Sequence, residues 1–223
     1  MIITENFEIA QKFTDLMLTA YSSENIKGRS GVHRSSIIDC PLTLYYTETG
    51  EAEQHFDENN VGIWLLGELC HIAFTKYFDA REKVFNLAGI KVTIDAIYNN
   101  KFPVELKTTR KKIYKREDLL DDWIHQLSIG MAVMESDVGY LIVMNIITFK
   151  LQVYEFHTTK EEREKILEHS LWTIIDISNA IKKRNPNLLK PKCEKCKTCS
   201  FRPIKGVDKK NCLFYRRRDI PYP

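Results

Sequence analysis

Residues 89–109 read GIKVTIDAIYNNKFPVELKTT and form the most informative segment of the chain. Apolar residues alternate on both sides of the pair Asn99-Asn100, which has the chemistry of a turn. The pattern therefore predicts two strands, residues 90–98 and 102–108, that pair as a hairpin.

The register of this hairpin decides which side chains meet. With residues 99–101 as a three-residue loop, the apolar positions of both strands pair on one face and Asp95 faces Glu105 on the other. A two-residue loop would send Asp95 and Glu105 to opposite faces, because one step of register reverses every side chain. The apolar pairing favours the three-residue loop.

Two carboxylates that face each other across a strand pair repel one another unless a cation neutralises them. Mg²⁺ takes oxygen ligands, so Asp95 and Glu105 form a candidate metal site. Lys107 shares the face of Glu105 and adds a positive charge. A metal, a bound water and a cation are what hydrolysis of a phosphodiester needs. The alternative is a surface hairpin with exposed charges.

Two residues on predicted helices extend this candidate site. Gly67 lies one helical turn before His71 and leaves space for close approach, and His71 offers a ring nitrogen to a metal. Gln126 lies in the helix after the hairpin, where its amide is placed to orient Lys107 or a substrate phosphate. A lone histidine or glutamine is more often structural. His71 and Gln126 are therefore site candidates only in combination with the hairpin residues.

The remaining pattern predicts a mixed α/β fold. Its expected elements are a helix at 5–22, a short helix carrying Cys40, a helix at 60–78, a strand at 84–87, the hairpin, a helix at 117–135, strands at 140–149 and 151–156, and a helix from Thr159 to Arg184. The strand at 140–149 is almost wholly apolar and is therefore expected at the centre of the sheet.

The composition is that of an ordinary globular protein, with 28% charged and 43% hydrophobic residues among 223. It argues against a disordered, collagenous or membrane protein. The longest apolar run, 140–149, is far shorter than the roughly 20 residues of a membrane span. The N-terminal residues lack the basic-then-apolar order of a signal peptide, so we expect a cytoplasmic protein.

The net charge of +3 hides an uneven distribution. Residues 181–223 contain 14 Lys and Arg against 3 Asp and Glu, whereas residues 1–180 carry a net charge of −8. A polyanion such as nucleic acid is the natural partner of the basic end. The alternative is a solvated tail.

Four of the six cysteines follow the spacing C-x2-C-x2-C-x12-C: Cys193, Cys196, Cys199 and Cys212. In a cytoplasmic chain this spacing indicates a metal site rather than disulfides. Four thiolates suit zinc or an iron–sulfur cluster, and the choice depends on whether distant Cys40 is a ligand. A set drawn only from the four local cysteines would indicate a zinc ribbon in a non-catalytic nucleic-acid-binding protein.

The order of these motifs resembles a known family. A helix with His71, then Asp95, then Glu105-Leu106-Lys107, is similar to the RecB-like branch of the PD-(D/E)xK nuclease superfamily. Cys40 combined with a distant cysteine cluster resembles its iron–sulfur members, the CRISPR-associated Cas-four exonucleases and their archaeal viral relatives above all.

The resemblance runs from about residue 35 to residue 212 and implies one compact unit in three parts. Residues 1–58 would be an N-terminal helical segment carrying Cys40. Residues 59–185 would be the nuclease core, a restriction-endonuclease-like sheet flanked by helices. Residues 186–223 would be a basic, cysteine-rich iron–sulfur module tied to the N-terminal segment.

The resemblance also implies roles for the hairpin residues. His71, Asp95 and Glu105, with the Leu106 carbonyl, would hold a catalytic Mg²⁺ or Mn²⁺. Lys107 would be the catalytic lysine.

Two further positions follow from the same comparison. Gln126 would be the glutamine that the family carries on its helix. Gly130 stands where the family usually has a tyrosine, so the resemblance does not extend to the substrate contact of that tyrosine.

The run CKTCSFRP, residues 196–203, resembles the closing segment of the family. It assigns a 4Fe–4S cluster to Cys40, Cys196, Cys199 and Cys212, with Cys193 as an alternative ligand. Ligation by Cys40 would close a loop of roughly 150 residues and stabilise the fold by several kcal/mol in the loop-entropy model, so we expect a structural cluster.

The implied activity is a metal-dependent exonuclease that hydrolyses single-stranded DNA from a 5′ end. A basic run after the hairpin is expected to bind the DNA backbone, with its tyrosine stacking on a base: Arg110, Lys111, Lys112, Tyr114, Lys115 and Arg116. The alternative for this run is a solvated loop. Roles in CRISPR adaptation with other adaptation proteins, in recombination or repair, and in viral DNA processing all stay open, as does the oligomeric state.

Overall fold

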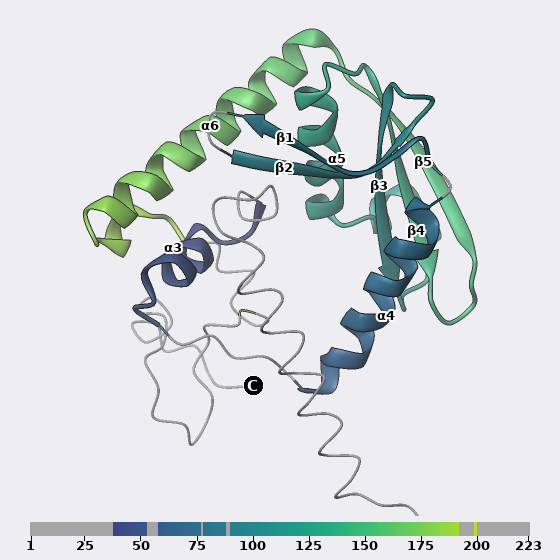
Figure 1. The fold of residues 1–223 in the computed structure, drawn as a ribbon, viewed down its shortest axis with the longest axis horizontal. Helices are drawn as coiled ribbons and strands as arrows, with labels where there is room; N and C mark the ends of the chain where they lie inside the picture. Colours follow the sequence, from purple (N-terminus) through teal and green to yellow (C-terminus); the bar gives the residue numbers. More distant parts are fainter. Residues whose placement is uncertain (1–37, 53–57, 77, 88–89, 192–198, 200–223) are drawn as a thin grey trace, which may run out of the picture.

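The computed structural model describes residues 38–52, 58–76, 78–87, 90–191 and 199 (Figure 1). The expected helix at 5–22 lies outside the described residues, as do three of the candidate ligands, Cys193, Cys196 and Cys212.

Five strands form one mixed sheet in the order β1-β2-β3-β4-β5. They are β1 (Ala80–Leu87), β2 (Ile90–Tyr98), β3 (Phe102–Thr109), β4 (Val138–Asn145) and β5 (Leu151–His157). Neighbours are antiparallel except β3 and β4, which are parallel. A parallel pair needs a crossover connection, and α5 (Asp121–Val133) supplies it. The mixed α/β fold and the central place of the apolar strand are confirmed.

Helices cover both faces of the sheet. On one face, Leu127 and Met131 of α5 pack against Leu141 and Val143 of β4. On the other face, Phe74 of α4 (Glu58–Thr75) packs against the β3 cluster that includes Val104 and Leu106. Consecutive β3 residues therefore point alternately towards α4 and towards α5.

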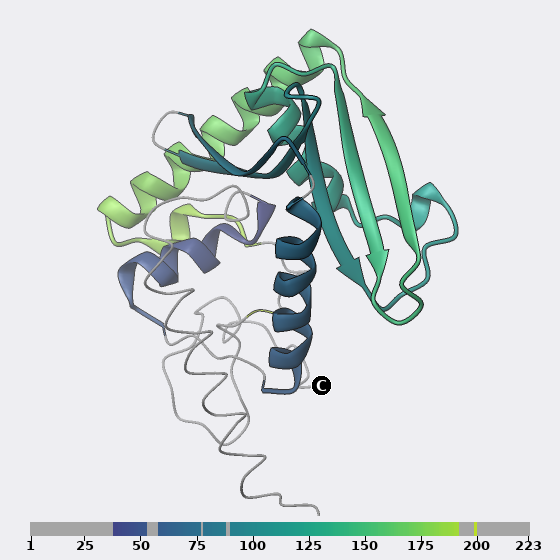
Figure 2. The ribbon, with the colours of Figure 1, turned by 45° about the vertical axis from the view of Figure 1, so that its right-hand side comes forward.

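The sheet is strongly bent. The β1–β2 pair turns away from the plane of β3, β4 and β5, and α4 runs along the front of the bend (Figures 1 and 2). The pairing of β2 with β3 is short and ends at Ala96↔Val104. The bend thus lies where β2 and β3 part.

The last long helix, α6 (Lys160–Lys182), starts at the expected capping box. Thr159 Oγ1 accepts from the Glu162 backbone N–H at 3.2 Å, and Glu162 Oε2 accepts from the Thr159 N–H at 2.8 Å. The helix packs on α5 and α3. It is followed by a single 3₁₀ turn, η2 (Pro186–Leu188).

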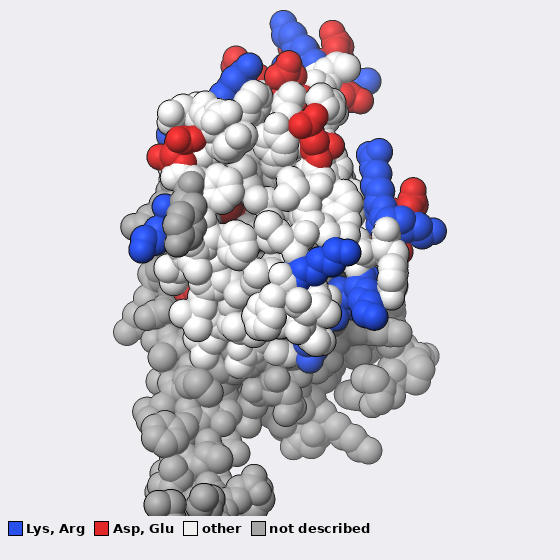
Figure 3. All heavy atoms as spheres, turned by 90° about the vertical axis from the view of Figure 1, so that its right-hand side faces the viewer, with Lys and Arg blue, Asp and Glu red and all other residues white. Residues whose placement is uncertain are grey.

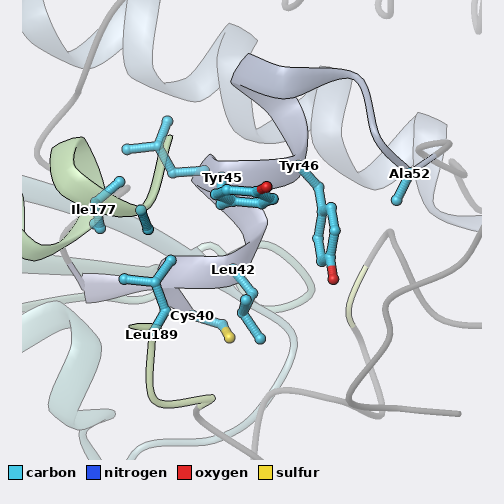
Figure 4. Close-up of a cluster of buried hydrophobic side chains, with 9 residues drawn as sticks. Cys40, Leu42, Tyr45, Tyr46, Ala52, Ile177 and Leu189 are labelled. Carbon is cyan, nitrogen blue, oxygen red and sulfur yellow. The ribbon is translucent and has the colours of Figure 1, made fainter. Parts of the chain in front are cut away.

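A separate core joins α3 (Pro41–Thr49) to the end of α6 (Figure 4). Its buried residues are Cys40, Leu42, Leu44, Tyr45, Tyr46, Ala52, Ile177, Ala180 and Leu189. The prediction that a helix carries Cys40 is corrected slightly, because α3 begins at Pro41 and Cys40 is its N-cap. Proline favours the first helical position, where its missing N–H costs nothing.

Three predicted boundaries were wrong. The strand expected at 140–149 runs from Val138 to Asn145, where the Asn145 side chain forms a turn. The helix expected at 117–135 is divided into η1 (Arg116–Asp118) and α5. β1 starts four residues before the expected 84–87 strand. No helix among the described residues is long and apolar enough to cross a membrane.

Candidate active site

The β2–β3 hairpin has the register expected from its sequence. The pairs Tyr98↔Phe102 and Ala96↔Val104 fit the loop of residues 99–101, and continuation of this register would place Asp95 opposite Glu105. The two strands part at that position. Beyond Ala96 a side chain replaces the backbone acceptor between β2 and β3. Asp95 Oδ2 accepts a hydrogen bond from the Leu106 backbone N–H at 2.9 Å. The Asp95 carboxylate is thereby fixed against the backbone of β3.

The Glu105 side chain is only 1% exposed, which is unusual for an ionised group. Its Oε1 lies 2.6 Å from Lys107 Nζ, and the Lys107 side chain is 19% exposed. Lys107 Nζ also donates to Gln126 Oε1 of α5. The lysine is thus held between a strand carboxylate and a helix amide, and the contact expected between Lys107 and Gln126 is present.

The α4 helix approaches β3 closely beside this pair. A Cβ built on Gly67 would lie 3.2 Å from Thr108 Oγ1, which is tighter than an ordinary van der Waals contact. One helical turn later, His71 Nδ1 lies 3.8 Å from Asp95 Oδ2. The absence of a side chain at Gly67 therefore lets α4 bring an imidazole to the Asp95 carboxylate.

The residues expected to bind a metal gather in two pairs. His71 lies beside Asp95, and Glu105 lies beside Lys107. Over the described ranges, no three His, Cys, Asp or Glu side chains come together closely enough to enclose an ion. Mg²⁺ does not require such a cage, since it is commonly bound by one or two carboxylates and keeps several waters. The donor chemistry of Asp95, Glu105 and the Leu106 carbonyl fits a hard divalent cation.

The basic run after β3 forms an anchored surface loop. Its charged residues and Tyr114 are exposed, whereas Ile113 is buried in the α5 core. Asp118 Oδ2 accepts from the Tyr114 N–H at 2.9 Å and from the Lys115 N–H at 3.2 Å, and these two bonds lower the pKa of Asp118. Arg116 lies over the Phe156 ring, 5.7 Å from its centroid. The loop therefore presents its cations from a fixed backbone.

One residue that organises this region has no counterpart in the sequence predictions. Asn145, at the end of β4, is a buried side chain that donates through Nδ2 to the Lys111 carbonyl at 3.0 Å. Its Oδ1 accepts from the N–H groups of Ile147 and Thr148, each at 3.0 Å. A polar residue at the end of an otherwise apolar strand is the sequence signal for this role.

Only two of the candidate iron–sulfur ligands lie among the described residues. Cys40 is buried in the α3 core, and Cys199 packs against the same core with its Sγ 4.0 Å from Thr43 Oγ1. Cys199 therefore lies against the start of α3. Cys70 on α4 is half-buried, and burial raises the pKa of its thiol.

Comparison with known proteins supports the fold. No protein-family model and no curated protein matches the chain. Among solved structures, SSO0001 aligns with a TM-score of 0.54 and 21% identity, over 86% of this chain and 94% of its own. An alkaline exonuclease from Laribacter hongkongensis, LHK-Exo, aligns with a TM-score of 0.51 and 10% identity, over 69% of this chain and 91% of its own. The likeness at these identities concerns the fold.

Proposed function

We propose that this protein is a metal-dependent DNA exonuclease. The observation that carries the proposal is the arrangement at the parting of β2 and β3, where Asp95 is fixed to the β3 backbone beside a buried Glu105–Lys107 pair. Burying a carboxylate costs several kcal/mol even when it is paired, so a fold does not need such a pair for stability. The fold likeness to LHK-Exo, described as an alkaline exonuclease, supports the same reading.

Each residue has a role in this proposal. Asp95 and Glu105, with the Leu106 carbonyl and His71, would hold Mg²⁺ or Mn²⁺. When bound, the ion supplies a water of lowered pKa and neutralises charge on the phosphate. Lys107, oriented by Gln126, donates to a phosphoryl oxygen and stabilises the negative charge that develops there.

The substrate assignment rests on the surface beside this site. The exposed cations of the loop after β3 suit a phosphate backbone, and Tyr114 offers an exposed ring to an unpaired base. Single-stranded DNA degraded from the 5′ end is what the sequence resemblance implies. Oligonucleotides labelled at either end, with the opposite end blocked by phosphorothioates, test this polarity.

A structural iron–sulfur cluster is part of the proposal. The packing of Cys199 against the core that contains Cys40 supports a ligand set shared between the two ends of the chain. Quantifying iron, sulfide and zinc in anaerobically purified protein tests it. Iron and sulfide that fall together in Cys40→Ala support the shared cluster, whereas bound zinc that is unchanged in Cys40→Ala would indicate a local ribbon.

The test of catalysis compares Glu105→Gln with Glu117→Gln, an exposed acid in the nearby η1. With a labelled single strand and Mg²⁺ or Mn²⁺, we expect Glu105→Gln to lose about 10²- to 10³-fold in rate and Glu117→Gln to retain it. Circular dichroism and urea unfolding of both variants confirm that the fold survives. Full activity in a folded Glu105→Gln protein would overturn the proposed site.

A further inference from the structure

The connection between β4 and β5 exposes apolar side chains where a polar turn would be usual. Residues 146–150, here named the hairpin tip, contain Ile147 at 65% exposure and Phe149 at 77%. Tyr114 of the neighbouring basic loop is 78% exposed. The two loops lie close together, since Asn145 bonds to the Lys111 carbonyl, and large apolar side chains exposed on neighbouring loops indicate a binding surface.

The hairpin tip is held in place rather than left free. Asn145 Oδ1 fixes the N–H groups of Ile147 and Thr148, and the Asn145 N–H donates to the Lys150 carbonyl at 2.9 Å. The Ile146 N–H donates to the Thr109 carbonyl at 2.9 Å, across to the end of β3. The exposed Ile147 and Phe149 side chains are therefore presented by an ordered turn.

Phe149 occupies a strained backbone position. Its φ is 55°, in the left-handed region that glycine and asparagine adopt readily and bulky residues avoid. An exposed phenylalanine contributes little to the core there, so its presence lowers stability without a packing gain. This is the pattern expected of a side chain retained for contact with a ligand.

The surroundings of the hairpin tip are basic. Asn145 Nδ2 donates to carbonyls of the basic loop, so the exposed cations of Arg110, Lys111 and Lys112 lie on the same edge as Lys150. Figure 3, which shows the right-hand side of Figure 1, has a broad uncharged surface with Lys and Arg side chains along its right margin and Asp and Glu side chains mostly at its top. Apolar rings edged by cations are complementary to bases joined by phosphates.

We propose that the hairpin tip is a second nucleic-acid contact, in which Phe149 stacks on a base while Lys150 and the basic loop bind the flanking phosphates. The inference deepens the proposed nuclease function. The hairpin tip lies beyond the end of β3, roughly 15 Å from Lys107 at 3.3 Å per strand residue. A DNA strand bound there would be held several nucleotides away from the reacting phosphate.

A second copy of the chain is a less suitable occupant. A twofold interface brings the same patch of both copies together. It would set the two basic loops against each other, and like charges across an interface oppose association. The charge of this edge therefore favours a polyanion.

The test measures binding without cleavage. Fluorescence anisotropy in EDTA follows a labelled single strand on the full-length protein, at several salt concentrations. We expect Phe149→Ala to weaken binding about tenfold, and Phe149→Trp to retain it. Trp172→Ala on α6 is the matched control, since that ring is 59% exposed and lies away from the basic loop, and we expect no change.

Abasic strands identify the contact as stacking. Placing one abasic site at successive positions should reveal a position where the wild type loses about as much affinity as Phe149→Ala does. At that position Phe149→Ala should cause no further loss. Charge reversal at Lys150 should instead weaken the binding of intact and abasic strands equally and reduce the salt dependence of the affinity.

A stability measurement separates a ligand contact from a structural role. Phe149→Asn relieves the backbone strain, so we expect a melting temperature about 2 to 4 °C higher together with weaker DNA binding. A structural role would lower the melting temperature. Equal affinity of wild type, Phe149→Ala and Phe149→Asn for every strand would overturn the proposal, and so would a change in mass by light scattering that showed Phe149 to hold a dimer.

These outcomes are independent of catalysis. Loss of affinity in Phe149→Ala with no cleavage in any metal would leave the second contact standing and remove the nuclease. Metal-dependent cleavage with unchanged affinity in Phe149→Ala would keep the nuclease and remove the second contact.

Discussion

Two of the hairpins in the sheet, β2–β3 and β4–β5, break the rule of apolar inside and polar outside in opposite directions. The β2–β3 hairpin buries the charges of Glu105 and, in large part, Lys107. The β4–β5 hairpin exposes Ile147 and Phe149. Each choice lowers stability relative to the usual arrangement. One hairpin is thus built around a polar centre and the other around an apolar contact surface.

The turns of the two hairpins differ in how well their residues suit a positive φ. Asn99 and Asn100 of the first turn have φ of 51° and 54°, and asparagine tolerates this region. Phe149 of the second turn has a similar φ without that tolerance. The first turn is suited to folding alone, whereas the second carries a residue that folding would not select.

The largest expected effect comes from unpairing the buried carboxylate. Lys107→Met removes the ammonium beside Glu105, and we expect a loss of about 3 kcal/mol in the free energy of unfolding, measured with urea in EDTA. The double variant Glu105→Gln/Lys107→Met should recover most of this loss. Lys91→Met, an exposed lysine of β2, serves as the control. A loss below about 1 kcal/mol in Lys107→Met would show that the pair is well solvated.

The second effect tests how the exposed hairpin is held. Asn145→Ala removes the bonds to the turn and to the basic loop, and we expect a loss of about 2 kcal/mol because three hydrogen bonds are lost together. Hydrogen exchange should rise at Ile147 and Thr148. Asn145→Asp keeps the acceptor for those two groups and removes the donor to Lys111, so protection at the turn should survive. Unchanged exchange in Asn145→Ala would refute the anchoring role.

The third effect concerns the approach of α4 to the buried hairpin. Gly62→Ala has nothing within 4 Å of the new Cβ and should stabilise the helix by roughly 0.5 to 1 kcal/mol. Gly67→Ala meets Thr108 Oγ1, and we expect it to be about 1 kcal/mol less stable than Gly62→Ala. The double variant Gly67→Ala/Thr108→Ala removes the Thr108 hydroxyl, so its stability should approach that of Gly62→Ala. Equal melting temperatures of the two single variants would show that α4 and β3 have room to separate.

The smallest effect tests the turn of the buried hairpin. Asn100→Ala places an alanine at positive φ and should lower stability by about 1 kcal/mol, whereas Asn100→Gly should be nearly neutral. Thermal unfolding measures both. If Asn100→Ala and Phe149→Asn changed stability in the same direction, the contrast between the two turns would fail.

The sequence predicted the features that depend on local pattern. Alternation of apolar residues and the two asparagines were enough to obtain the register around residues 99–101, because one step of slippage would reverse every side chain. For Gln126 the sequence left Lys107 and a substrate phosphate as alternative partners, and the structure shows the contact with Lys107. The cluster ligands, the domain boundaries and the catalytic roles stay predictions.

The features that the sequence did not yield depend on tertiary context. The first half of β1 contains the charged residues 81–83, and an edge strand needs no apolar alternation to form. The end of β4 depends on an Asn145 side chain that bonds to a loop 34 residues earlier. The insertion of the Asp95 carboxylate between strands depends on the bend of the sheet, which no single segment encodes.

The position of α3 has a consequence for synthesis on the ribosome. Its core partners come from the far end of the chain, and Cys199 contacts Thr43 across a separation of 156 residues. At 5 to 20 residues per second, α3 emerges roughly 10 to 30 s before that partner is made. In a nascent chain the aromatic side chains of α3, Tyr45 and Tyr46, thus stay exposed after the residues of the sheet have been synthesised. This exposed apolar surface is one that a chaperone would bind.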